Sequence, residues 1–288
     1  MLSFYVYNLL IPGDPNIVSL TTPAGTWTLT KAPNYAAMKQ LITTPAQRPQ
    51  QLPVAETYFL ENPVGMQDGS AAVDRALDEV TPILLAASYA TGRSVTIERS
   101  TMGSSIQIVQ PSDHWPRVRS MGHAGDVINS DAEFTRLVEA FVQAWPAAGQ
   151  TEKGLVLIHH WIDAQSCWSM EDLYLSATTL LQVIVKTESA RQNGKHLYFY
   201  NGVTDAAARM GITPLSTDFR DMRNDLVHEG TLSGTSFPGK QKADCAAVIA
   251  ETLNWFDEYV HVALGLGQMA KVRFSAQPFL SLNAYSLS

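Results

Sequence analysis

Cysteine is scarce in this chain of 288 residues, which contains only two, Cys167 and Cys245. Two cysteines are too few for a disulfide-rich fold, and they leave no further thiol for a zinc knuckle. Both fall within apolar helical patterns, so we expect reduced thiols in the protein core rather than a disulfide or a nucleophile.

Long hydrophobic runs are also missing. Runs such as Ile83 to Ala87 are far shorter than the roughly 20 residues that a transmembrane helix needs. The N-terminal stretch from Met1 to Tyr7 carries no basic side chain, so it does not have the pattern of a signal peptide. We therefore expect a cytoplasmic protein with no membrane partner.

An excess of basic residues is absent as well. The chain has 20 Lys and Arg against 27 Asp and Glu, and its formal net charge is −7. Residues 1–150 contain 9 basic and 13 acidic side chains, and residues 151–288 contain 11 and 14. These balances exclude a broad polybasic surface, so a nucleic-acid ligand would have to be held by a local site.

The N-terminal part of the chain has the pattern of a β-rich domain. Phe4 to Tyr7 and Thr26 to Thr30 are β-branched or aromatic runs separated by Pro and Gly. A helical pattern follows from Ala71 to Tyr89, which Pro82 interrupts and could kink. Alternation from Val95 to Val109 then predicts a hairpin. We assign residues 1–130 to an N-terminal β-rich α/β domain.

The second half of the chain is helical by its apolar periodicity, and we assign residues 131–270 to a helical domain and residues 271–288 to a tail. The expected fold class is therefore α+β. Helices are predicted over residues 131–144, 155–165, from 169 onward, 204–209, 217–228 and 244–264.

The segment from Phe219 to Gly230 carries the most distinctive pattern in the chain. Arg223 is followed directly by Asn224 and, after four intervening residues, by His228. At about 100° per residue on an ideal helix, Asn224 and His228 share a polar face, whereas Arg223 lies about 140° from His228. The two side chains could meet if two copies of the helix faced each other, or if the last turn unwound.

These residue types suit the cleavage of RNA without a metal. That reaction needs a base for the 2′-hydroxyl proton, an acid for the leaving 5′-oxygen and a cation for the transition-state phosphorane. A histidine such as His228 transfers protons near neutral pH, and the planar guanidinium of Arg223 stabilises phosphate charge. Asn224 could orient His228 or bind a phosphate oxygen.

The Arg-Asn pair, the spacing to the His and the order of the helices resemble the HEPN superfamily, over about residues 150–265. The β-rich region, helix and hairpin upstream resemble its Apea-like branch. The resemblance implies an antiparallel helical bundle that often dimerises through the motif helices. In ribonuclease members it implies catalytic roles for the residues at Arg223 and His228, with Asn224 in support. The superfamily also includes members that bind without cleaving.

Two functions therefore fit the sequence. The first is a homodimeric, metal-independent endoribonuclease, as a toxin or antiviral defence effector. The second is a non-catalytic module for binding or dimerisation that recognises a nucleotide or protein partner. In that second case Arg223 would be structural, paired with an acid such as Glu171, and Asn224 with His228 would form a hydrogen-bonded pair at a helix end.

Other polar residues are further candidates for a functional site. Arg220, Lys240 and Lys242 are the candidate RNA-binding residues around the motif. His159, His160 and Asp163, with His196 as a remote further group, have a weak metal-like pattern, but positions at the edge of the core or at an interface fit the histidines better, so we expect no metal and no cofactor. His114 and His123 fall in an irregular segment and fit a solvated loop better than a nucleic-acid contact.

Overall fold

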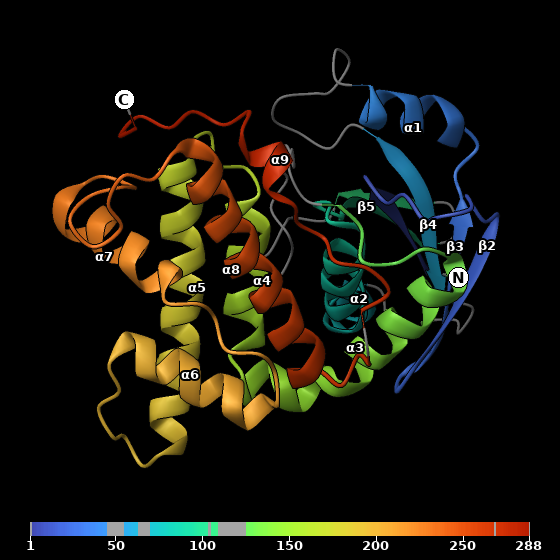
Figure 1. The fold of residues 1–288 in the computed structure, drawn as a ribbon. Helices are drawn as coiled ribbons and strands as arrows, with labels where there is room; N and C mark the ends of the chain where they lie inside the picture. Colours follow the sequence, from blue (N-terminus) through green and yellow to red (C-terminus); the bar gives the residue numbers. More distant parts are fainter. Residues whose placement is uncertain are drawn as a thin grey trace. The chain divides into compact units, whose positions relative to one another are not determined.

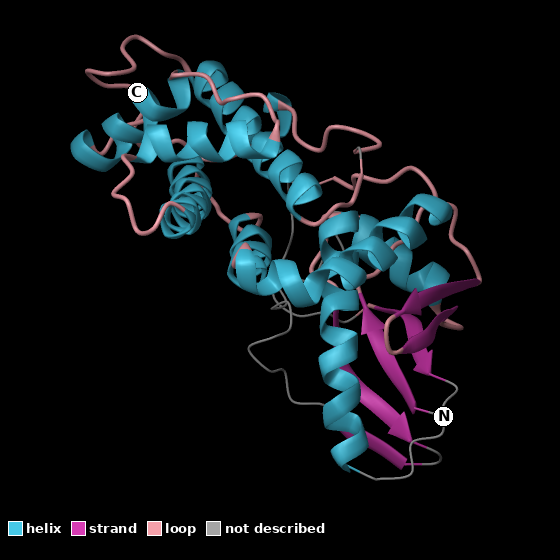
Figure 2. Cartoon of the chain, turned by 90° about the horizontal axis from the view of Figure 1, so that it is seen from below, coloured by secondary structure: helices cyan, strands magenta, loops and turns pink. Residues whose placement is uncertain are grey.

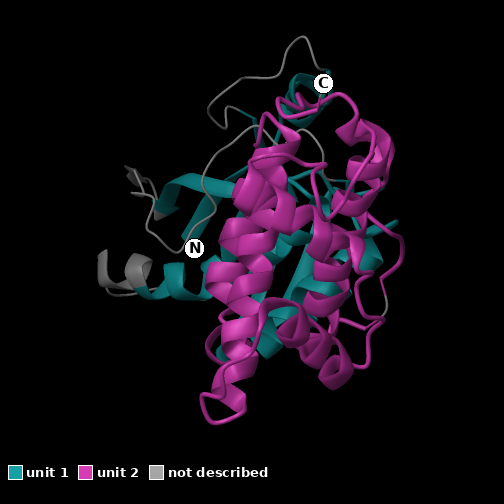
Figure 3. Cartoon of the chain, turned by 60° about the vertical axis from the view of Figure 1, so that its left-hand side comes forward, with its two compact units in different colours: residues 1–146 teal, residues 147–288 magenta. Residues whose placement is uncertain are grey.

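The computed structural model describes residues 2–44, 55–62, 70–102, 105–108, 125–267 and 269–287. It divides into two compact units, residues 1–146 and residues 147–288 (Figure 3). The first contains an antiparallel sheet and the second is mostly helical, which confirms a mixed α+β protein. The sequence placed the boundary after residue 130, at the start of helix α3 (Asp131–Thr151), whereas the two compact units divide within this helix, after residue 146.

The sheet of the first unit is antiparallel throughout its described part (Figure 2, magenta), with the strand order β2-β3-β4-β1-β5-β6. The predicted hairpin is present, because β5 and β6 pair directly. The strands are β1 Leu2–Tyr7, β2 Ile17–Thr22, β3 Gly25–Lys31, β4 Glu56–Asn62, β5 Thr96–Met102 and β6 Ser105–Ile108.

The sequence singled out β1, β3 and the β5–β6 hairpin, but it did not single out β2 or β4. β2 alternates between exposed and buried residues, with Val18 and Leu20 inside, as expected for a strand with one solvated face. The central strand β1 is buried at almost every position, so it reads as a continuous apolar run. The helix α1, Tyr35–Thr43, was not predicted; it buries only Tyr35 and Ile42, which is too few apolar positions for a clear periodicity.

Helix α2, Ser70–Thr91, confirms the helix predicted in this region and continues through Pro82. Its C-terminal half is buried all round, from Val80 to Ala90, as expected for a helix inside a core. Polar groups there are satisfied locally: the Ser88 hydroxyl donates to the carbonyl of Leu84. Pro82 lies inside this helix and does not end it.

The second unit is built around α5, which packs against α4, α6, α7 and α8 (Figure 1). Ser169 caps α5, accepting a hydrogen bond from the backbone N–H of Asp172 at 3.1 Å. α6 begins earlier than expected. The helices are α3 Asp131–Thr151, α4 Gly154–Ala164, α5 Met170–Arg191, α6 Phe199–Met210, α7 Asp218–Glu229, α8 Lys242–Ala263 and α9 Ala276–Phe279.

A buried ionic network ties four segments of the second unit together. Arg209 binds Glu188 at 2.7 Å and Glu152 at 3.6 Å, and Arg191 also binds Glu152. The Tyr259 hydroxyl donates to Glu152 at 2.7 Å. Each buried carboxylate therefore has a guanidinium and hydrogen-bond partners, as buried charges require.

The C-terminal tail packs against the second unit. The carbonyl of Asn283 accepts a 2.8 Å hydrogen bond from the N–H of Met170, and Ser286 contacts both Glu171 and Leu232. None of the helices in the described ranges is long and apolar enough to cross a membrane.

Candidate functional site

Helix α7 arranges the motif residues in three parallel stripes. Each stripe has the spacing i, i+3, i+7, which places its members on one side of a helix. Gly230 ends the helix in the left-handed conformation, at a φ of 73°, where glycine carries no steric penalty. The stripes are Phe219, Met222 and Leu226; Arg220, Arg223 and Val227; and Asp221, Asn224 and His228.

The first stripe anchors the helix in the core, because Phe219, Met222 and Leu226 are all buried. The ring of Tyr200 in α6 stacks on Phe219 at a centroid distance of 5.7 Å. From α5, the Tyr174 hydroxyl donates to the backbone carbonyl of Phe219. The motif helix is thus held against both α5 and α6, and this fixes the direction of the other two stripes.

The second stripe is cationic and lies over aromatic rings. The guanidinium of Arg220 lies 5.2 Å from the ring centroid of Tyr200, and that of Arg223 lies 4.9 Å from that of Phe199. Arg220 is also paired with Asp221 of the same helix at 2.7 Å. Both rings come from the first turn of α6, so this turn positions the two cations.

Arg223 has no carboxylate partner among the described residues. Its polar contact is a hydrogen bond from Nη1 to Asn224 Oδ1 at the long distance of 3.4 Å. The pairing with Glu171 offered above as an example of a structural role is not formed, and Glu171 Oε1 instead accepts two hydrogen bonds from Ser286. The positive charge of Arg223 is therefore not neutralised within its own described surroundings.

The third stripe faces solvent at its C-terminal end. His228 is exposed, and none of the described residues forms a hydrogen bond or ion pair with its imidazole. It lies in the last turn of α7. The chain does not bring His228 and Arg223 into contact, and neither lines any of the three cavities given below.

Asp225 is a further residue of this segment whose contacts indicate a role, and the sequence did not single it out. It is fully buried, and its carboxylate accepts hydrogen bonds from the backbone N–H groups of Gly234, Ser236 and Phe237 at 2.7–2.8 Å. Burial raises the pKa of this carboxyl, but the three backbone hydrogen bonds outweigh it, so the pKa lies below its usual range. Asp225 therefore shapes the loop that follows the motif.

That loop and the tail enclose a cavity of about 470 Å³ whose lining includes Lys240 and Lys242. Lys240 also lies over the ring of Phe237 at 4.7 Å. Ser286 of the tail lines the same cavity. The two candidate RNA-binding lysines thus share one cavity on the C-terminal side of the motif loop.

The remaining sequence candidates do not form a metal site in the described part of the chain, where no group of three or more His, Cys, Asp or Glu side chains could hold an ion. His160 is exposed, and His196 lies against the ring of Tyr198. His114 and His123 fall outside the described residues. Both cysteines are free, and burial raises the pKa of the Cys245 thiol to about 11, which leaves it unreactive.

A second aromatic and polar cavity, of about 420 Å³, opens at the start of α6. Its lining includes His196, Tyr198 and Tyr200. Tyr200 also contacts Arg220 of the motif helix, so this cavity adjoins the cationic stripe.

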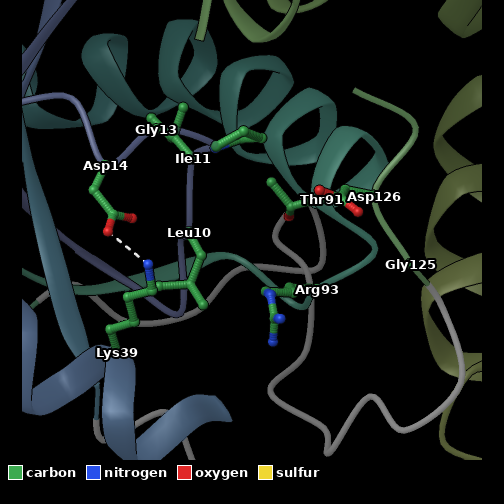
Figure 4. Close-up of a pocket in the computed structure, with 10 residues that line it drawn as sticks. Leu10, Ile11, Gly13, Asp14, Lys39, Thr91, Arg93, Gly125 and Asp126 are labelled. Carbon is green, nitrogen blue, oxygen red and sulfur yellow. Dashed lines mark hydrogen bonds and ion pairs between the residues drawn. The ribbon is translucent and has the colours of Figure 1, made fainter. Parts of the chain in front are cut away.

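The first unit contains a smaller cavity of about 210 Å³, between the segment after β1 and the end of α2 (Figure 4). Asp14 on its wall binds Lys39 at 2.5 Å and accepts a 2.6 Å hydrogen bond from Tyr35. Burial raises the pKa of Asp14, but these two hydrogen bonds more than offset it, and the pKa is lowered. The volume is below the roughly 300 Å³ at which small-molecule pockets begin.

Comparison of the chain with protein-family models, with curated proteins and with solved structures found no match.

Proposed function

We propose that this protein is a metal-independent endoribonuclease of the HEPN type, whose helical unit supplies Arg223, Asn224 and His228. The observation that carries the proposal is the surroundings of the Arg223 and His228 side chains. The Arg223 guanidinium has no carboxylate partner in the described residues, and the His228 imidazole is exposed beside a helix end that Gly230 terminates. Both groups are free to bind phosphate.

The reaction follows from these groups. A neutral imidazole accepts the proton of the RNA 2′-hydroxyl, and the 2′-oxygen forms a bond to phosphorus. The bond from phosphorus to the 5′-oxygen breaks, and an imidazolium donates a proton to that leaving oxygen. His228 performs these proton transfers, whereas Arg223 stabilises the negative charge of the phosphorane. The products are a 2′,3′-cyclic phosphate and a 5′-hydroxyl.

The active species in this proposal is a homodimer. Arg223 and His228 belong to different stripes of α7 and do not meet within one chain, so each site would combine Arg223 of one copy with His228 of the other. Val227 supports such an interface, because this apolar side chain is 46% exposed and follows Arg223 by one helical turn. Asp225 adds no repulsion there, since its charge is held by the backbone of its own loop.

The cellular role that fits this activity is that of a cytoplasmic toxin or antiviral effector. RNA would be held locally, because the second unit has no net basic charge to offer. Lys240 and Lys242 share a cavity beside the motif loop, which suits them to bind the RNA backbone. The β-rich N-terminal domain would then recognise a trigger or restrain the nuclease.

A second candidate is a non-catalytic HEPN module that binds a nucleotide or protein partner. The position of Arg223 over the Phe199 ring favours it, because the same contact can be structural. The separation of Arg223 from His228 within one chain also agrees with it.

One experiment separates the two candidates. Purified full-length protein is incubated with total RNA in the presence of EDTA, beside His228→Ala and Arg223→Ala. The nuclease proposal requires cleavage by the wild-type protein and its loss in both variants. Binding without cleavage by all three proteins would favour the second candidate.

A further inference from the structure

The start of α6 combines an exposed aromatic side chain with a hollow. Tyr198 is the N-cap residue of α6 and is 74% exposed, although a tyrosine of this size usually buries most of its ring. It lines the cavity of about 420 Å³ together with His196, Tyr200 and Asn201. This volume lies within the range of pockets that take small ligands.

The aromatic groups of the cavity are held in place by neighbours. The His196 ring packs edge-on against Tyr198 at a centroid distance of 5.2 Å, with 70° between the planes. Tyr200 is fixed from behind, because it stacks on the buried ring of Phe219. A planar group that entered the cavity would therefore meet the ring of Tyr200 in a fixed orientation, which reduces the entropy lost on binding.

The cavity is joined to the motif helix through one residue. Tyr200 lines the cavity and also lies under the guanidinium of Arg220, at 5.2 Å. The preceding residue, Phe199, lies under Arg223 in the same manner. A chain with alternating planar bases and phosphates could thus place a base in the cavity and its neighbouring phosphate beside the two arginines.

Polar groups complete the cavity. Lys195 is exposed on its rim and can bind a phosphate, and Asn201 offers both donors and acceptors for a base edge. Asp205 is engaged elsewhere, because its Oδ2 accepts a hydrogen bond from Gln192 at 3.2 Å. Aromatic rings beside a lysine favour a nucleic-acid strand over an acidic peptide, because bases stack on the rings while the lysine binds a phosphate.

We propose that this cavity is a nucleobase subsite for single-stranded RNA, in which a base next to the scissile bond stacks on Tyr198. The inference rests on the proposed function for the identity of the ligand. It adds a specificity-determining contact outside the motif, at residues His196, Tyr198 and Tyr200. A flipped or unpaired base has its stacking face free, so single-stranded segments are bound in preference to duplex RNA.

The test measures binding apart from cleavage. Full-length His228→Ala protein is titrated into a fluorescein-labelled single-stranded RNA, and the fluorescence anisotropy gives the Kd. In the same background, Tyr198→Ala should weaken binding by roughly 5- to 150-fold, the range expected for one lost stacking contact. Tyr198→Phe should bind as the parent does, because it keeps the ring. Tyr285→Ala is the matched control, since Tyr285 is 76% exposed but lies in the tail.

A cross-linking arm locates the base directly. RNA that carries 5-iodouridine is irradiated with the His228→Ala protein, and the modified peptide is found by mass spectrometry. A cross-link at His196, Tyr198 or Tyr200 supports the subsite. Unchanged affinity of Tyr198→Ala, or cross-links confined to other segments, overturns it.

The outcomes also separate the subsite from the nuclease proposal. If wild-type protein cleaves RNA but Tyr198→Ala cleaves and binds equally well, the subsite is wrong and the nuclease stands. If wild-type protein never cleaves while binding depends on Tyr198, the nuclease is wrong and the subsite stands. If no RNA binds at all, both are overturned.

Discussion

The carboxylate of Asp225 accepts a 2.8 Å hydrogen bond from the backbone N–H of Phe237, twelve residues further along the chain. It also binds the N–H groups of Gly234 and Ser236, so one side chain in the motif helix determines the path of the loop behind it. Charge-assisted hydrogen bonds of this kind are stronger than neutral ones. The loop conformation beside His228 therefore depends on an acidic residue that neither cleaves nor binds RNA in our proposal.

Asp225→Asn should lower the free energy of unfolding by roughly 1–3 kcal/mol, because an amide cannot accept all three hydrogen bonds and loses the charge. Urea denaturation followed by circular dichroism measures the change. Asp172→Asn is the control, since Asp172 is exposed and its substitution should alter stability by less than about 0.5 kcal/mol. Equal stabilities of the two variants would contradict the role of Asp225.

His261 should make the protein less stable in mild acid. Burial and, to a smaller extent, the nearby charge of Arg273 lower the pKa of this imidazole to about 4, against a hydrogen bond to the carbonyl of Asp257 that raises it. Because the folded-state pKa lies below the unfolded value of about 6.5, the folded protein binds fewer protons. The stabilisation is present above pH 6.5 and is lost as the pH falls toward 4, by up to about 3 kcal/mol.

The measurement is the free energy of unfolding between pH 7 and pH 4 for wild-type protein and His261→Gln. The variant should lack most of the pH-dependent loss over this interval. The exposed His160→Gln serves as the control and should follow the wild-type curve. An identical pH dependence in all three proteins would show that His261 does not titrate in this way.

Ser286 should hold the tail on the motif loop. Its hydroxyl donates to Glu171 at 2.8 Å and accepts from the N–H of Leu232 at 3.1 Å. Ser286→Ala removes both contacts, so the amide of Leu232 should exchange its hydrogen faster, as its protection falls by about 1 kcal/mol. Hydrogen exchange read by mass spectrometry detects this, with the exposed Ser281→Ala as a control. Equally slow exchange of the Leu232 amide in both variants would refute this role of Ser286.

A site built from Arg223 of one copy and His228 of the other predicts that a mixture of two inactive variants regains activity. Arg223→Ala and His228→Ala should each be inactive alone, but a heterodimer of the two contains one complete site. Mixing and re-equilibrating equal amounts should therefore restore about a quarter of the wild-type rate. Val227→Asp should weaken the dimer, as seen by light scattering at micromolar concentration. No recovery on mixing, in heterodimers that demonstrably form, would mean that each site lies within one chain.

Sequence patterns predicted most of the elements that carry a clear period. β1 was recognisable as a continuous apolar and aromatic run, β3 and the hairpin by their β-branched and alternating residues, and the long helices by the helical spacing of their apolar residues. α1 was not, since only two of its residues are buried. The early start of α6 was missed because Phe199 and Tyr200 follow an exposed, polar stretch that resembles a loop.

The candidate site was predictable only in its composition. The order of Arg223, Asn224 and His228 is visible in the sequence, and so is the helix that carries them. The partners of these residues are not, because Phe199, Tyr200 and the loop at Gly234 are brought to the motif by tertiary packing. Asp225 was not singled out, because its burial against three N–H groups depends on a fold that no local pattern encodes.

The most direct measurement is the chemistry of the RNA ends. Full-length protein is incubated with a defined single-stranded RNA in EDTA, and the products are resolved by mass spectrometry. We expect fragments with a 2′,3′-cyclic phosphate and a 5′-hydroxyl, and a rate that falls by roughly 10²- to 10⁴-fold in His228→Ala. Arg223→Ala should lose activity to a similar or greater extent. Cleavage that requires a divalent metal, or that continues at the wild-type rate in both variants, would contradict the assignment of Arg223 and His228.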